Sequence, residues 1–133
     1  MISGIDHIGI AVRSIDEARG FYEALGLEIE AIEDVPAEGV RVALIPCGES
    51  RIELLEATAP DSPISRFIEK RGPGMHHICL SASNIRADQE TLQSSGYSVL
   101  RPEPSRGAEG CWVQFVHPRE TGGVLIELSE GSE

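Results

Sequence analysis

Lysine, paired cysteines and long apolar runs are scarce in this chain of 133 residues, and each shortage excludes a class of protein. Lys70 is the one lysine, and 22 acidic against 11 basic side chains give a net charge of −11, which would repel a nucleic acid. No apolar run approaches the roughly 20 residues of a membrane-spanning helix, and the N-terminus lacks the basic-then-apolar pattern of a secretion signal. We therefore expect a soluble, cytoplasmic protein with neither nucleic acid nor membrane as a partner.

The three cysteines, Cys47, Cys79 and Cys111, are scattered and include no CxxC pair. This pattern argues against a disulfide framework or a zinc knuckle, so we expect reduced and mostly buried thiols. The 41% of hydrophobic residues is enough to bury the core of one compact domain.

Two stretches, residues 5–12 and 75–82, read alike and carry a histidine at the same place. His7 and His77 are 77 − 7 = 70 residues apart. The same offset relates a polar cap, an isoleucine and a closing glycine in each half: Ser14 and Asn84, Ile15 and Ile85, Gly26 and Gly96. Two copies of one unit that pack about a two-fold axis bring such histidines to a shared centre, so the duplication predicts a metal site.

Hydrophobic periodicity and turn signals predict the order βαβββ in each half, and hence the α+β class. In the first half we expect a strand at 4–12, a helix from Ser14 to Gly26, and strands near 27–34, 39–46 and 50–56. In the second half we expect a strand from 75, a helix from Asn84 to Ser95, and strands near 97–101, 111–116 and 124–129. The chain would be a single domain of two repeats, about 4–58 and 74–130, joined by a helical segment at 59–73.

Strand parity places small residues beside each histidine. Residues two apart point the same way, so His7 shares its face with Gly9 and Ala11, while the intervening apolar residues face the helix. By the same rule His77 lies on the equivalent face and His76 on the helix side. We therefore expect a hollow face with room for a ligand, onto which His77 rather than His76 projects.

A glutamate interrupts the last apolar strand of each half at matching places, Glu53 and Glu127, with 127 − 53 = 74. A buried carboxylate is costly unless a cation or a set of hydrogen bonds compensates it. Two histidines and two glutamates could bind that cation, and such a mixed set suits Co, Ni, Mn, Fe or Zn while leaving two octahedral positions open for catalysis. The alternative for Glu53 is an edge strand that faces water. His117, before Pro118, is expected to be a turn residue, and Trp112 and Phe115 are expected in the core.

These motifs resemble the vicinal oxygen chelate superfamily of glyoxalases, bleomycin resistance proteins and dioxygenases, and within it the methylmalonyl-CoA epimerases. The stretches that carry the resemblance cover nearly the whole chain and are 6–12, 52–56, 61–64, 71–78 and 117–128. The doubled histidine after Gly-Pro-Gly and the segment Gly-Gly-Val-Leu-Ile-Glu-Leu point to the epimerase branch. The resemblance implies two βαβββ modules in an open, cupped mixed sheet, and a homodimer.

The resemblance also implies a site and an activity. A divalent metal, cobalt first and nickel, manganese or zinc as alternatives, would be bound by His7, His77 and Glu127, with Glu53 as the fourth ligand. The activity would be interconversion of (2R)- and (2S)-methylmalonyl-CoA by proton abstraction and return through a metal-stabilised enolate.

Inversion needs an acid/base group on each face of that enolate, and we expect Glu127 as the first and Glu53 as the second. In some relatives the second base falls at the position of Val42, so this assignment stays open. Glu38, Glu49 or a water near residues 106–110 are the substitutes.

Three other functions use the same fold. A glyoxalase-like lyase or isomerase would need the same four ligands, and an iron-dependent dioxygenase would need three ligands and oxygen. A metal-free protein that sequesters a small molecule would need none of them.

Overall fold

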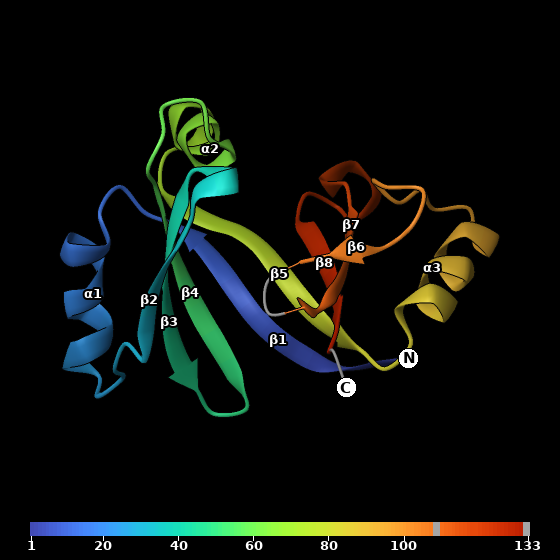
Figure 1. Cartoon of the computed structure of the whole chain (residues 1–133), viewed down its shortest axis with the longest axis horizontal. Coiled ribbons are helices and arrows are strands. Elements are labelled where there is room, and N and C mark those ends of the chain that lie inside the picture. The colour runs from blue at the N-terminus through green and yellow to red at the C-terminus, as the bar shows by residue number, and fades with distance from the viewer. Residues whose placement is uncertain (108–109, 132–133) are drawn as a thin grey trace. The chain divides into compact units, whose positions relative to one another are not determined.

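The computed structural model describes residues 1–107 and 110–131 (Figure 1). Its contacts divide the chain into two compact units, one of Met1–Asp6 with His77–Glu133 and one of His7–His76. Strand β1 (Ile2–Ala11) crosses the boundary and so contributes residues to both units. The division into repeats at 4–58 and 74–130 stays a prediction.

The His7–His76 unit follows the order βαβββ and then adds a helix. After β1 come α1 (Ile15–Ala24), β2 (Ala31–Val35), a 3₁₀ turn (Pro36–Glu38), β3 (Val40–Cys47), β4 (Ser50–Ala57) and α2 (Pro63–Arg71). The strands hydrogen-bond in the order β2-β3-β4-β1, with β3 antiparallel to its neighbours and β1 parallel to β4. The sheet is therefore mixed.

Helix α1 begins where the sequence predicts, because Ser14 caps it. The Ser14 hydroxyl accepts a hydrogen bond from the Glu17 N–H at 3.3 Å, and the Glu56 carboxylate of β4 accepts one from the Ile15 N–H at 2.7 Å. Both bonds satisfy backbone donors that the first helical turn leaves free. Just beyond the helix Gly26 adopts a φ of 88°, a conformation that favours glycine and ends the helix.

Two apolar clusters cover the two faces of this sheet. On one face Val12, Ala43, Ile45 and Leu54 pack with Ile15 of α1, and on the other Ala11, Val40 and Leu55 pack with Ile64 of α2. In Figure 1 these helices are the dark blue α1 and the green α2. The clusters fix β4, the strand that carries Glu53, between its neighbours.

We expect Leu54→Ala to lower the free energy of unfolding by about 2–5 kcal/mol, because it leaves a cavity at a fully buried position. Leu25→Ala is the control, since Leu25 is 67% exposed and its loss should change that free energy by less than about 0.5 kcal/mol. Urea denaturation followed by circular dichroism measures both, and equal effects would contradict the assigned core.

The other unit repeats the order βαβββ. It contains β5 (Gly74–Ala82, from His77 onward), α3 (Ile85–Ser94), β6 (Ser105–Arg106), β7 (Trp112–Val116), a 3₁₀ turn (Pro118–Glu120) and β8 (Leu125–Glu130). The strands hydrogen-bond in the order β1-β5-β8-β7-β6, with β5 and β8 parallel. Helix α3 packs through Ile85 against Ala82 and Leu128. The predicted α+β class with two βαβββ halves is confirmed.

The strand predicted at 97–101 is wrong, since the short β6 pairs with β7 instead. The Leu100 N–H still donates to the Phe115 carbonyl at 2.8 Å. At Arg101, however, the amide of the buried Gln114 bonds both the N–H, at 3.2 Å, and the carbonyl, at 3.0 Å. Pro102 and Pro104 then offer no N–H, so the ladder cannot continue.

The expectation of reduced and mostly buried cysteines has a mixed outcome. All three cysteines are free, but only Cys79 is buried, while Cys111 is half-buried and Cys47 is exposed beside the β3–β4 turn. Among the described residues no helix has the length and apolar character needed to cross a membrane.

Candidate functional site

The first pair of candidate ligands, His7 and Glu53, lies on the parallel strands β1 and β4. Their register sets His7 opposite Arg51 and Gly9 opposite Glu53. Because alternate residues share a face, all four point to the face opposite α1. Glu53 is only 9% exposed, and β4 lies between β3 and β1. The alternative of a water-facing glutamate on an edge strand is therefore wrong.

One oxygen of the Glu53 carboxylate carries the contacts of this pair. Glu53 Oε2 lies 3.5 Å from His7 Nδ1. It also accepts hydrogen bonds from Arg51 Nη2 at 2.9 Å and Nε at 3.3 Å. The Arg51 guanidinium thus supplies part of the positive charge that a buried carboxylate requires.

The second pair, His77 and Glu127, lies on the parallel strands β5 and β8 of the other unit. Their register sets His77 opposite Leu125 and Cys79 opposite Glu127, so these side chains share the face away from α3. His77 Nε2 lies 3.3 Å from Glu127 Oε1, and both side chains are largely shielded from solvent. The structure therefore brings each predicted histidine together with the glutamate of its own half.

The donors fit a divalent transition metal. Distances of 3.5 Å in the first pair and 3.3 Å in the second exceed those of good N–H···O hydrogen bonds. Two donors bound at about 2.1 Å to one ion at tetrahedral or octahedral angles are roughly 3.0–3.4 Å apart, a range that includes the second distance and ends just below the first. Imidazole nitrogen with carboxylate oxygen is also the donor chemistry that Co, Ni, Mn and Zn accept.

The face expected to be hollow is partly filled. Ala11, which shares the face of His7, packs under α2 with Leu55 and Ile64, and Val42 packs against the same cluster. The end of this face that carries Ala11 and Leu55 is therefore covered by α2. The sequence missed this because it gives no indication that α2 covers the far end.

Two other histidines have separate roles. His76 makes an edge-to-face contact with Phe67 of α2, with centroids 5.0 Å apart. His117 Nδ1 accepts a hydrogen bond from the Arg119 N–H at 3.1 Å and caps the turn that follows. Its prediction as a turn residue is confirmed.

The aromatic residues expected in the core are only half-buried. Arg86 and Arg106 stack on the Trp112 ring at 5.3 and 4.2 Å from its centroid, and Arg101 stacks on Phe115 at 5.1 Å. The Trp112 ring also packs against the core cluster of Ala82, Ile85 and Leu128, so the expectation of a core position is met in part for Trp112.

Sequence reasoning also missed two glutamates that support the site from the opposite face. Glu56 and Glu130 each stand three residues after the candidate ligand of their strand. Their carboxylates accept the first backbone N–H of α1 and of α3, both at 2.7 Å. Their offset, 130 − 56 = 74, equals that of Glu53 and Glu127 and could have revealed them.

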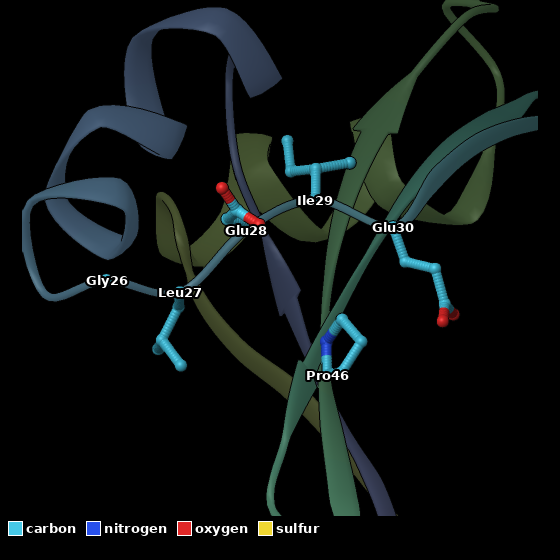
Figure 2. Close-up of a pocket in the computed structure, with 6 residues that line it drawn as sticks. All are labelled: Gly26, Leu27, Glu28, Ile29, Glu30 and Pro46. Carbon is cyan, nitrogen blue, oxygen red and sulfur yellow. The ribbon is translucent and has the colours of Figure 1, made fainter.

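A pocket lies at the connection between α1 and β2 (Figure 2), and none of the four candidate ligands lines it. It is lined by Gly26, Leu27, Glu28, Ile29, Glu30 and Pro46. It contains no histidine or cysteine, and its two carboxylates belong to neither pair. We therefore do not assign it to the chemistry of the site.

The Glyoxalase/Bleomycin resistance protein/Dioxygenase superfamily model matches residues 6–115. The chain belongs to this superfamily. Its similarity to proteins named methylmalonyl-CoA epimerase extends over nearly its whole length, which confirms the resemblance seen in the sequence motifs.

Three relatives illustrate that similarity. The ethylmalonyl-CoA/methylmalonyl-CoA epimerase of Cereibacter sphaeroides is 39% identical, over 98% of this chain and 99% of the relative. The uncharacterized protein YqjC of Bacillus subtilis is 42% identical, over 95% and 91%. A solved methylmalonyl-CoA epimerase in complex with methylmalonyl-CoA and NH4+ is 35% identical, with a TM-score of 0.88 over 99% of this chain and 96% of that one.

Proposed function

We propose that this chain is a methylmalonyl-CoA epimerase, an isomerase that interconverts the (2R) and (2S) forms of its substrate. The observation that carries the proposal is a His–Glu pair shielded from solvent in each half of a chain that matches the Cereibacter sphaeroides epimerase over nearly its full length. Methylmalonyl-CoA as substrate is supported by the relative solved with that ligand.

The reaction requires removal of the proton on the carbon between the thioester and the carboxylate. We propose that His7, His77 and Glu127, with Glu53 as the fourth candidate, hold one divalent metal ion, cobalt being preferred. When bound, the ion supplies positive charge for the negative charge that develops on the substrate oxygens as the proton leaves. The shielding of both pairs from solvent strengthens that electrostatic effect.

Two carboxylates are available to move the proton. Inversion needs a proton acceptor on one side of the planar carbon and a donor on the other, and the roles exchange in the reverse direction. Glu127 and Glu53 come from different halves and are proposed for the two sides. Val42 cannot supply a base, and Glu38 and Glu49 are both exposed. Homodimer formation and cytoplasmic localisation stay predictions.

We expect the cobalt-loaded protein to incorporate one deuterium at the central carbon of methylmalonyl-CoA in heavy water, starting from either epimer. Mass spectrometry of the recovered thioester measures this, and chelator-treated protein is the control. Absence of exchange with metal bound would overturn the epimerase assignment and favour a glyoxalase-like reaction. Protein that takes up none of Co, Ni, Mn or Zn would favour a metal-free binding protein.

A further inference from the structure

The two halves differ at one position beside their otherwise matching pairs. The 74-residue offset that relates Glu53 to Glu127 relates Arg51 to Leu125. The strand registers agree, since Arg51 lies opposite His7 and Leu125 lies opposite His77. One pair therefore has a permanent cation at a place where the other has an aliphatic side chain.

Arg51 is in direct contact with the carboxylate of its pair. Its Nη2 and Nε atoms donate to the same Glu53 oxygen at 2.9 and 3.3 Å. The guanidinium is 34% exposed, whereas the carboxylate is buried. Charge-assisted hydrogen bonds of this kind are stronger than neutral ones, and two of them fix the orientation of the carboxylate as well as its charge.

That contact changes what Glu53 offers to a metal. The oxygen that lies 3.5 Å from His7 Nδ1 is the one that Arg51 holds. An ion at this oxygen would lie close to a guanidinium, and like charges at such a distance repel strongly where solvent is excluded. Leu125, at the matching position of the other half, is uncharged and brings no repulsion of its own.

We propose that Arg51 is a positioning residue that fixes Glu53 for proton transfer and weakens its bond to the metal. His7, His77 and Glu127 are then the principal ligands. This inference rests on the proposed function, in which Glu53 could be a metal ligand, a proton-transfer group or both. It assigns Glu53 mainly to proton transfer. Arg51 acts through Glu53 and needs no contact with the substrate.

The test is Arg51→Met, which keeps much of the aliphatic length and removes the charge. Titration of the metal-free protein with Co²⁺ in a calorimeter should show an affinity raised by about 5- to 50-fold, because a repelling cation is gone. Turnover by the cobalt-loaded variant should fall by about 10- to 100-fold in kcat, because Glu53 is no longer fixed, with KM changed by less than about threefold. A general loss of structure would instead lower both the Co²⁺ affinity and kcat.

Arg51→Lys should restore the Co²⁺ affinity to near the original value and recover part of kcat. Arg19→Met is the matched control, because Arg19 on α1 also forms an ion pair, with Glu23 of the same helix at 3.1 Å, on the face of the sheet opposite Glu53. Its loss should leave the Co²⁺ affinity and kcat unchanged. If Arg51→Met does not fold, Arg51→Gln takes its place.

A 10- to 100-fold loss of Co²⁺ affinity would overturn the inference, because it would show that Arg51 orients Glu53 as a ligand. An unchanged kcat, or a large rise in KM alone, would overturn it as well. Failure of this inference can be told apart from failure of the proposed function. If the proposed function is wrong, the unmodified protein exchanges no deuterium. The Co²⁺ affinities of Arg51→Met and the unmodified protein can be compared in either case.

Discussion

Glu127→Gln should leave the protein folded and reduce epimerisation of methylmalonyl-CoA by at least about 1000-fold. The amide has nearly the same shape as the carboxylate, so the packing of β8 is kept. It carries no negative charge, however, and cannot accept the proton from the substrate. One substitution therefore removes a proposed proton-transfer group and weakens the proposed metal set, and the two losses fall on the same reaction.

The measurement is kcat with either epimer, together with deuterium exchange and metal content. Glu130→Gln is the matched control: Glu130 lies on the same strand, but its carboxylate accepts the first N–H of α3. Glutamine retains a carbonyl oxygen for that bond, so we expect activity within about twofold of the parent. Full activity of Glu127→Gln would show that Glu127 neither moves the proton nor matters to the metal.

His77→Ala should abolish metal binding at micromolar concentration and, with it, turnover. Loss of groups that merely orient a ligand costs about 10- to 100-fold in metal affinity, so loss of the ligand itself should exceed about 100-fold. The imidazole lies 3.3 Å from Glu127 Oε1, and its removal leaves that carboxylate without its neighbouring donor to the ion. Co²⁺ titration of the metal-free variant measures the effect directly.

The adjacent His76 is the internal control for this experiment. His76→Ala loses the edge contact with Phe67, so we expect a lower unfolding midpoint and an unchanged Co²⁺ affinity. If His76→Ala instead loses the metal while His77→Ala retains it, the strand parity that selects His77 is wrong for β5.

The arrangement of each half could be predicted from the sequence because the same structural signals occur in both halves. A cap, a closing glycine and a histidine that recur at a fixed offset are individually weak signals, but together they set the strand parity. The strand registers place His77 and Glu127 on one face of their sheet, and His7 and Glu53 on one face of theirs. Family resemblance then supplied the reaction, which no residue pattern states on its own.

The remaining features depend on contacts that are distant in the sequence. Residues 97–101 have strand-like composition, but the amide of Gln114 takes the backbone groups of Arg101. The identity of the Glu53 partner was equally hidden. Arg51 is two residues away and reads as a polar neighbour, and only the coordinates show both of its nitrogens on one carboxylate oxygen.

Glu56 and Glu130 have a consequence for accuracy at the reaction centre. Strands β1 and β4 are parallel and have no hairpin between them, so no tight turn dictates how they align. A slip by one residue would turn Glu53 to the opposite side of the sheet. The bond from the Ile15 N–H to Glu56 is broken by such a slip, and Glu130 places the same restraint on β8. The hydrogen bond at each helix start thus fixes the register of the strand that carries a proposed proton-transfer carboxylate.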